Sequence, residues 1–261
     1  MTPLPIPPAI PRVALVTGAA DRLGRAIALS LADAGFDIAL HRRHSIAAAE
    51  QTAATIRERG RAAVVLAAEL SDEAAVSGLL PAAEAALGPV GVLVNNASAF
   101  ERDEWDTVTR ASWDCHMLPN LRAPFRLMQL FAKALPETAE GVVVNMIDQR
   151  VWSITPHFVS YTVSKAGLWA LTQAMALALA PRIRVNGIGP GPALPSPRQT
   201  TEQFARQSDS VPLRHGTSPE EVGRAVLAIL SLPAMTGQML ALDGGQHLQW
   251  ASGRAASPFP E

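Results

Sequence analysis

The sequence has little cysteine, and this shortage excludes two kinds of site. Cys115 is the one cysteine among 261 residues. A single cysteine cannot form an intrachain disulfide, and without a C-x-x-C pair there is no basis for a thiolate metal site. We therefore expect no metal centre and a reducing, cytoplasmic location.

An excess of positive charge is also missing, and so is any long apolar run. The formal net charge is -1, which gives no broad basic surface for a nucleic-acid backbone or an anionic membrane. No stretch approaches the length of a membrane span, and the segment Met1–Pro11, with five prolines, does not have the basic start and apolar run of a signal peptide. The predicted partner is a small-molecule substrate, with no nucleic acid and no membrane.

Tyrosine and lysine are scarce as well, and two of these few residues are close in the sequence. Tyr161 is the one tyrosine, and Lys165 is one of two lysines. They lie four residues apart in the apolar run Phe158–Ala180, so a helix would place them on one face. A phenol has a pKa of about 10, and a nearby ammonium lowers it toward the range useful for acid catalysis. The pair indicates a proton-transfer site, and the alternative is a pair on a helix surface.

From Val13 onward, short β-type runs alternate with longer amphipathic runs, which is typical of a parallel sheet covered on both faces. Strands are predicted at Val13–Val16, Asp37–His41, Ala63–Ala67, Val92–Asn95, Val142–Asn145, Ile183–Gly187 and Met239–Leu242. Helices are predicted near Leu23–Ala34, Ala47–Glu58, Asp72–Leu87, Ser112–Leu135, Phe158–Ala180 and Pro219–Leu230. The predicted class is α/β: a doubly wound Rossmann fold with a seven-stranded parallel sheet in the order 3-2-1-4-5-6-7, flanked by helices, with ligands at the carboxyl ends of the strands.

The same pattern divides the chain into three parts. We expect a flexible proline-rich N-terminus at 1–11, a single dinucleotide-binding catalytic domain at 12–249 and a tail at 250–261. The loop Gly189–Pro197 is expected to be mobile or ordered by a partner.

The first strand runs into a glycine-containing turn, Thr17–Gly24, followed by a helix. A tight turn at Gly18, the free N–H groups of the helix start and a second glycine for close packing together suit a dinucleotide pyrophosphate. The alternative is an ordinary turn between strand and helix. Arg22 stands where a glycine is usual, so its guanidinium can reach phosphate or substrate.

The second strand is followed by basic residues and by no carboxylate. His41, Arg42, Arg43, His44 and Ser45 stand where a fold that prefers NAD would place an acidic residue on the ribose 2′-hydroxyl. Two arginines suit a 2′-phosphate, so NADP(H) is the predicted cofactor. The alternative is a solvated basic turn.

Five motifs occur in an order known from one family: Thr17–Gly24, Asn95-Asn96-Ala97-Ser98, Tyr161-x-x-x-Lys165, Pro190-Gly191 and Asp243-Gly244-Gly245. On these motifs the chain resembles the short-chain dehydrogenase/reductase family from about Arg12 to Gln249. The resemblance implies that Tyr161 is the acid catalyst, that Lys165 lowers its pKa, that Asn120 joins a proton relay, and that the enzyme is a homotetramer. The implied cofactor site also contains Leu23, Glu69, Leu70, Asn96, Ala97, Ser98, Pro190 and Gly191. Two departures concern this site, because Glu69 replaces an aspartate and no threonine follows Pro190-Gly191 closely.

A third departure concerns the substrate. Asp148 lies 13 residues before Tyr161, where carbonyl-reducing members of the family have a serine. A carboxylate would repel a developing alkoxide, whereas a carboxyl group can hydrogen-bond a ring nitrogen or donate a proton to it. Asp148 therefore predicts a C=N substrate, and the alternative is that Asp148 caps the end of a strand.

With Asp148, Arg22, the turn His41–Ser45, Ser98-Ala99-Phe100 and the ending Asp243-Gly244-Gly245-Gln246-His247-Leu248, the chain resembles pteridine reductases and the bacterial dihydromonapterin reductases. This resemblance implies that Phe100 stacks a pterin against the nicotinamide and that Ser98 and Arg22 contact the pterin or the cofactor phosphate. Phe100 as an ordinary core residue is the alternative. The predicted reaction is the NADPH-dependent reduction of dihydropterin to tetrahydropterin. The other possibilities are a carbonyl or alcohol oxidoreductase and a non-catalytic nucleotide-binding regulatory protein.

Overall fold

The computed structural model describes residues 5–196 and 198–248. The tail predicted at 250–261 lies outside the described residues, as do Gln249 and Pro197. The N-terminal segment from residue 5 packs on the rest of the chain, because Ile10 is buried and the Arg12 guanidinium donates to the Ile6 carbonyl. The packed part of the chain therefore begins before residue 12.

The sheet has the predicted strands and the predicted order. The strands are β1 (Val13–Val16), β2 (Asp37–Arg42), β3 (Ala63–Ala67), β4 (Val92–Asn95), β5 (Gly141–Met146), β6 (Ile183–Pro190) and β7 (Met239–Leu242). They pair in parallel in the order β3-β2-β1-β4-β5-β6-β7, which confirms the doubly wound seven-stranded sheet. Strands β5 and β6 extend beyond their predicted ends, to Met146 and Pro190.

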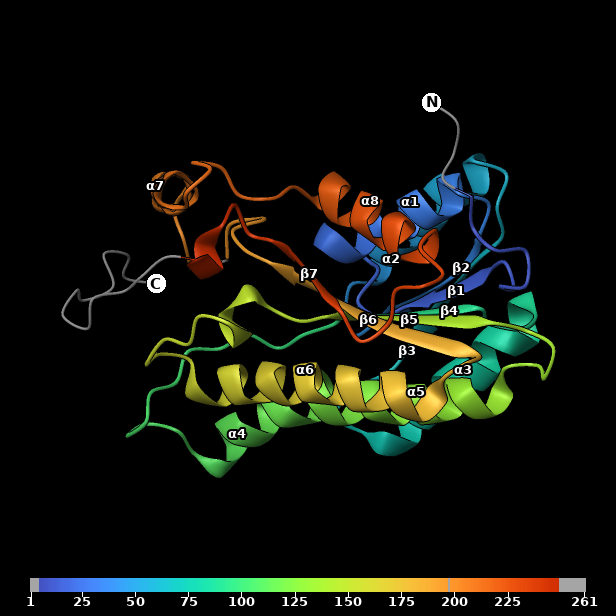
Figure 1. Cartoon of the computed structure of the whole chain (residues 1–261), viewed down its shortest axis with the longest axis horizontal. Coiled ribbons are helices and arrows are strands. Elements are labelled where there is room, and N and C mark those ends of the chain that lie inside the picture. The colour runs from blue at the N-terminus through green and yellow to red at the C-terminus, as the bar shows by residue number, and fades with distance from the viewer. Residues whose placement is uncertain (1–4, 197, 249–261) are drawn as a thin grey trace.

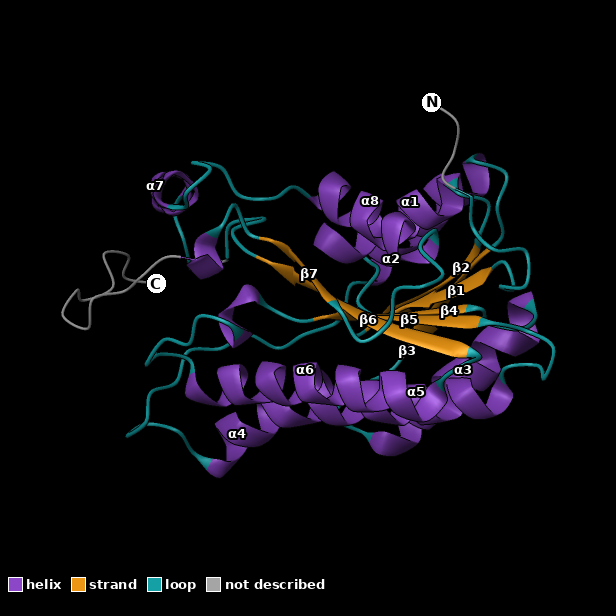
Figure 2. Ribbon diagram, viewed as in Figure 1, coloured by secondary structure: helices purple, strands orange, loops and turns teal. Residues whose placement is uncertain are grey.

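Helices cover both faces of this sheet (Figures 1 and 2). They are α1 (Arg22–Asp33), α2 (Ile46–Glu58), α3 (Glu73–Leu87), α4 (Arg110–Met117), α5 (Ala123–Ala134), α6 (Val159–Leu179), α7 (Thr201–Ser210) and α8 (Pro219–Leu230). One face carries α1, α2 and α8, and the other carries α3, α5 and α6, with α4 packed against α6. Burial on both sides explains why β1 and the first three residues of β4 are apolar without alternation.

The predicted helix Ser112–Leu135 is wrong in one respect, because it is interrupted. A π-helical turn at Leu118–Arg122 separates α4 from α5. Pro119 and Pro124 have no N–H to donate within a helix, and a local π turn is a common way to accommodate such a loss. The interruption matters for the site because Asn120 lies inside it.

Helix α7 has no counterpart in the sequence prediction. A capping box defines its start: the Thr200 hydroxyl accepts from the Gln203 N–H, and the Gln203 side chain accepts from the Thr200 N–H. The spacing Thr-x-x-Gln is the sequence signal that could have revealed it. None of its described residues is buried, so it has no apolar stripe to recognise. It lies apart from both helical layers (Figure 1).

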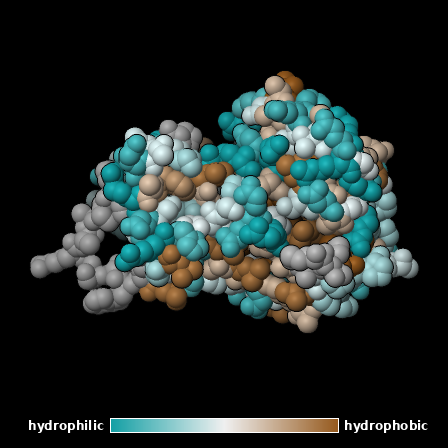
Figure 3. Space-filling model, turned by 90° about the horizontal axis from the view of Figure 1, so that it is seen from above, coloured by the Kyte–Doolittle hydropathy of each residue, from teal (hydrophilic) through white to brown (hydrophobic). Residues whose placement is uncertain are grey.

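The face that carries α1, α2 and α8 is mixed in character (Figure 3). Seen from the side of α1, α2 and α8, hydrophilic side chains predominate and apolar ones form scattered patches (Figure 3). Within residues 5–196 and 198–248, every helix is too short or too polar to cross a bilayer. The predicted cytoplasmic location stays a prediction.

Candidate active site

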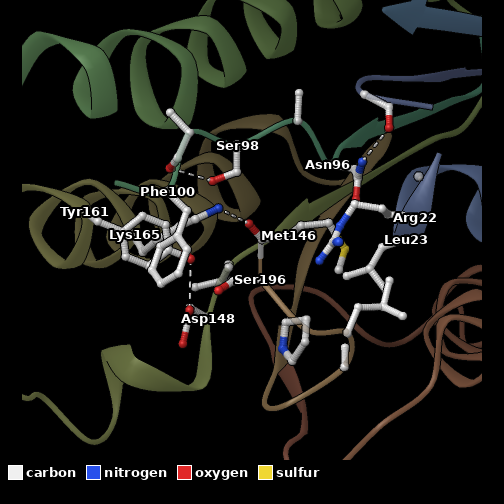
Figure 4. A pocket seen from close by; sticks show the side chains of 18 of the residues that line it. Arg22, Leu23, Asn96, Ser98, Phe100, Met146, Asp148, Tyr161, Lys165 and Ser196 are labelled. Carbon is white, nitrogen blue, oxygen red and sulfur yellow. Dashed lines mark hydrogen bonds between the residues drawn. The ribbon is translucent and has the colours of Figure 1, made fainter. Parts of the chain in front are cut away.

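A cavity of about 750 Å³ lies at the carboxyl ends of the strands. Sixteen of the predicted site residues line it: Gly18, Arg22, Leu23, His41, Arg43, Glu69, Leu70, Asn96, Ala97, Ser98, Phe100, Asp148, Tyr161, Lys165, Pro190 and Gly191. Phe100, Tyr161, Lys165 and Asp148 gather on one side of it, and Arg22, Leu23 and Asn96 lie on the other (Figure 4). The fold thus brings the predicted proton-transfer group and the predicted phosphate turn to two ends of one cavity.

The proton-transfer group is a connected cluster. The Tyr161 hydroxyl donates to Asp148 Oδ2 at 2.9 Å. The Lys165 ammonium donates to the Met146 carbonyl at 2.8 Å, and its nitrogen lies 5.7 Å from the centre of the Tyr161 ring. Tyr161 is 6% exposed and Lys165 only 2%, so the pair is not an ordinary helix-surface pair.

Lys165 is an unusual lysine because its charged group is buried. Burial lowers its pKa from 10.5 to about 8, and the neighbouring Asp148 carboxylate opposes this shift. The Met146 carbonyl belongs to the last residue of β5, so strand β5 and helix α6 fix the ammonium together. Near neutral pH this arrangement places a positive charge close to the Tyr161 phenol.

Asp148 makes two contacts, one through each carboxylate oxygen, and the first confirms that it acts as a cap. Its Oδ1 accepts from the Arg150 N–H at 2.8 Å and so caps the short 3₁₀ turn Gln149–Val151. Its Oδ2 remains for Tyr161 and faces the cavity. The cap fixes the orientation of the carboxylate, so its second oxygen points toward the Tyr161 hydroxyl.

The glycine turn is built around Gly18, which has a φ of +63°. The Asn96 amide donates to the carbonyls of Thr17 at 2.8 Å and Gly18 at 3.1 Å. The Thr17 hydroxyl accepts from the N–H groups of Asn96 and Ala97. The Asn-Asn-Ala segment after β4 therefore supports the turn after β1.

We expect Gly24→Ala to damage this turn, while Gly78→Ala should not. A Cβ at Gly24 would overlap the Gly18 carbonyl, whereas a Cβ at Gly78, which also lies inside a helix, would meet nothing within 4 Å. Gly24→Ala should lower the free energy of unfolding by about 1–3 kcal/mol and weaken NADPH binding. Gly78→Ala should raise it by about 0.5–1 kcal/mol. Chemical denaturation and NADPH titration measure both effects, and equal behaviour of the two variants would contradict the packing argument.

Helix α1 begins beside this turn and has features that suit an anion. Its first turn contains no acidic residue, and no side chain caps its N-terminus. The positive end of the helix dipole and the free N–H groups are therefore available to a phosphate. Arg22, the first residue of α1, has a φ of +50° and donates to the Pro195 carbonyl at 3.1 Å, which joins the turn to the loop after β6.

The residues at the end of β2 and just after it divide into two groups. His41 is buried and uses both ring nitrogens within the protein, because Nδ1 accepts from the Gly18 N–H and Nε2 lies 3.1 Å from the Ala68 carbonyl. Burial lowers its pKa, so it is a neutral support for the glycine turn. Arg43 lines the cavity and pairs with Glu69 at 3.6 Å, while Arg42, His44 and Ser45 lie outside the lining.

Asn120 lies behind the cavity wall. It is buried, and its side chain contacts the Ala99 N–H and carbonyl, the Ser98 hydroxyl and the Ser164 hydroxyl. It does not line the cavity. Its contacts hold the segment that carries Ser98 and Phe100, so Asn120 helps to position these two cavity residues.

Phe100 is not a core residue, because it is only partly buried and lines the cavity. Its ring stacks on Phe158 at 4.6 Å between centroids and meets the Tyr161 ring edge-on at the same distance. The Arg198 guanidinium carbon also lies over this ring, 5.4 Å from its centroid. Phe158 therefore covers one face of the ring, and a flat ligand that stacks on Phe100 must share the remaining face with the Arg198 guanidinium or displace it.

Sequence reasoning missed several residues of the cavity. They include Cys115, Met146, Gln149, Arg150, Ser196, Arg198, Phe204 and Gln207. Half of these eight lie on the loop after β6 or on α7, and Gln149 and Arg150 lie in the short 3₁₀ turn, where no hydrophobic period marks them. Ser196 and Gln149 each have a buried side-chain oxygen with no hydrogen-bond partner among the described residues.

The fold and the cavity define a class of protein, a dinucleotide-dependent oxidoreductase with a doubly wound sheet. A family model described as enoyl-(acyl carrier protein) reductase matches residues 18–247. The chain belongs to this family, that of the short-chain dehydrogenases/reductases, which confirms the family predicted from the motifs.

Several similar proteins are named as reductases or dehydrogenases, and their names give different substrates. A crystal structure of the FolM alternative dihydrofolate reductase 1 of Brucella canis with NADP is 46% identical, with a TM-score of 0.91 over 95% of this chain and 98% of that chain. Pteridine reductase 1 of Leishmania tarentolae is 33% identical over 90% of this chain and 96% of its own length. A probable galactose dehydrogenase of Rhizobium meliloti is also 33% identical, over 90% of this chain and 94% of its own length.

Proposed function

We propose that the protein is an NADP(H)-dependent reductase that reduces a C=N bond of a pterin-type substrate, from dihydropterin to tetrahydropterin. One observation carries this proposal: the hydrogen bond between the Tyr161 hydroxyl and the Asp148 carboxylate, which stands where ketone reductases have a serine. Two similar proteins, the Brucella and Leishmania enzymes, are a dihydrofolate reductase and a pteridine reductase by name.

The residues present fit NADP(H). The start of α1 offers free N–H groups and the positive end of a helix to the pyrophosphate. Arg43 at the cavity wall, with Arg42 before it, supplies positive charge for a 2′-phosphate, and the related Brucella enzyme was solved with NADP. When bound, NADPH supplies the hydride.

Tyr161 and Asp148 supply the proton in the proposed reaction. Reduction of C=N adds a hydride to carbon and a proton to nitrogen, so the protein must deliver one proton per turnover. The Tyr161 hydroxyl is the donor, since the Lys165 ammonium near its ring stabilises the phenolate that remains. In the free enzyme Asp148 Oδ2 accepts the hydrogen bond of this hydroxyl. When the phenol gives its proton to the substrate instead, the Asp148 carboxyl group, protonated from solvent, hydrogen-bonds the ring nitrogen and returns a proton to the phenolate.

The substrate ring lies between these groups and the cavity wall in our proposal. Phe100 provides an aromatic face, Ser98 a hydroxyl and Arg22 a cation at the cavity lining. Asn120 keeps Ser98 and Phe100 in place through its two bonds to Ala99.

Parallel assays test this function against its alternative. NADPH oxidation is followed at 340 nm with dihydrobiopterin, dihydromonapterin, dihydrofolate and a panel of ketones. Turnover with at least one dihydropterin, well above that with every ketone, is the expected result. Turnover with ketones alone would replace the proposal by a carbonyl reductase, and no turnover with NADPH bound would favour the regulatory alternative.

The pKa of Lys165 gives the proposal a pH dependence. Because the ammonium loses its proton as the pH rises through about 8, kcat/KM for NADPH, which reports the free enzyme, should fall above that pH. Lys165→Arg, whose charge is permanent, should have a lower rate and no such decline. A wild-type profile that stays flat to about pH 10 would show that this ammonium is not needed.

We also propose the homotetramer that the family resemblance implies. Helix α6 exposes Val163 and Leu177, which are apolar side chains that self-association would cover. Light scattering coupled to size exclusion gives the mass directly.

A further inference from the structure

The loop between β4 and α4 carries Phe100, and two side chains hold this residue from both sides. The Asn120 carboxamide accepts from the Ala99 N–H at 2.8 Å and donates to the Ala99 carbonyl at 2.9 Å. His116 Nε2 accepts from the Glu101 N–H at 2.9 Å. Phe100 thus lies between two anchored neighbours, and the anchors are four residues apart in the sequence.

The same two side chains continue to helix α6. His116 Nδ1 lies 2.6 Å from the Ser160 hydroxyl, and the Asn120 amide donates to the Ser164 hydroxyl at 3.1 Å. Ser160 and Ser164 are also four residues apart, and Tyr161 lies between them. Two parallel bridges therefore join the loop of Phe100 to the helix of Tyr161.

We propose that His116, Ser160 and Asp103 are positioning residues that hold Phe100 against Tyr161 and so set how the substrate ring lies in the cavity. The proposal rests on the function proposed above and adds these three residues to its site. Asn120 builds one bridge, and His116 with Ser160 builds the other. The bridge itself lies outside the cavity lining, so it acts on the site through the residues that it holds.

The hydrogen bonds of the His116 bridge run in one direction. Since Nε2 accepts from the Glu101 N–H, the ring proton is on Nδ1 and is donated to the Ser160 hydroxyl. That hydroxyl then donates to Asp103 Oδ2, and Asp103 Oδ1 accepts from the Ser160 N–H at 3.2 Å. All three side chains are buried, so each bond is protected from competing water.

The geometry at the rings shows what the bridge controls. Phe100 meets Tyr161 edge-on with 4.6 Å between centroids, and the His116 ring is 5.9 Å from the same Tyr161 ring. The carbonyl of Asp103 also accepts from the Phe158 N–H, and Phe158 is the residue that stacks on Phe100. Loss of the bridge would therefore free Phe100 and Phe158 relative to Tyr161, with no direct effect on the glycine turn.

The test compares His116→Leu, which removes the hydrogen bonds with Glu101 and Ser160 at similar size, with His116→Gln, whose carboxamide oxygen can still accept from the Glu101 N–H. Thr172→Val is the control, since it removes the buried hydroxyl hydrogen bonds with Leu168 and Asn145 from the same helix, and neither of these bonds is made to the loop. Hydrogen–deuterium exchange of a peptide covering residues 98–104, thermal unfolding, NADPH affinity and dihydropterin kinetics are measured for all three.

Exchange in this peptide should rise about tenfold in His116→Leu, and less in His116→Gln, with NADPH affinity unchanged in both. KM for the dihydropterin should rise in the same order. Thr172→Val should lower the unfolding temperature without changing either quantity. Wild-type exchange in His116→Leu, or an equal rise in Thr172→Val, would overturn the proposal. Exchange needs no substrate, so a wild-type enzyme inactive with every pterin would refute the proposed function and leave this test intact.

Discussion

Replacing Tyr161 with phenylalanine is expected to reduce dihydropterin turnover by about 10²- to 10⁴-fold, the usual contribution of a positioned proton donor. The change removes one hydroxyl and keeps the ring that contacts Phe100 and lies near Lys165. Asp148 stays in place because Arg150 still donates to its other oxygen. Steady-state NADPH oxidation and fluorescence titration of NADPH should show lost catalysis with retained binding.

Thr162→Val is the matched control for this variant. Thr162 is the next residue of α6, and its buried hydroxyl has no hydrogen-bond partner among the described residues. Its loss should leave the rate close to that of the wild type. A Tyr161→Phe enzyme that keeps most of its activity would mean that another group delivers the proton.

Replacing Asp148 with serine is expected to change which substrate is reduced. The carboxyl group that hydrogen-bonds the ring nitrogen would be lost, so kcat/KM for the dihydropterin should fall about 10²-fold or more. A neutral hydroxyl no longer repels a developing alkoxide, so reduction of ketones should become measurable. The same panel of dihydropterins and ketones, assayed with NADPH, measures both changes.

Two measurements separate this effect from misfolding. Serine can still cap the turn at Arg150, so thermal unfolding and NADPH affinity should stay close to those of the wild type. Asp148→Asn keeps the shape and loses the charge, and it should lose pterin reduction without gaining ketone reduction. Retained pterin reduction in the serine variant would show that Asp148 serves only as a cap.

The sequence predicted the sheet well because its strands are buried runs with clear boundaries. Val13–Val16 and Val92–Asn95, for example, have the predicted limits. The meeting of Asp148 with Tyr161 was also predictable, since one follows a strand end and the other starts a helix on the same edge of the sheet. Parallel strands bring such positions together whatever the loops between them do.

Other parts depend on contacts that no local pattern records. Arg198 reaches Phe100 across 98 positions of sequence, and His116 reaches Ser160 across 44. His41 differs from these cases, because this basic residue near the end of β2 is a buried, neutral support of the glycine turn. Its residue type and its position in the sequence predicted a contact with the cofactor. The folded turn shows instead that the His41 ring contacts the Gly18 N–H and the Ala68 carbonyl.

The burial of Lys165 also affects the stability of the fold, and the charged form that catalysis needs is the form that destabilises the folded chain. Its pKa is about 8 in the folded chain and near 10.5 when exposed, so between these values the unfolded chain binds a proton that the folded chain does not. For this group the free energy of unfolding therefore rises as the pH increases from 8 to 10.5, by an amount on the order of a few kcal/mol. At the pH where the ammonium is charged and useful, the fold carries the full penalty of burying it.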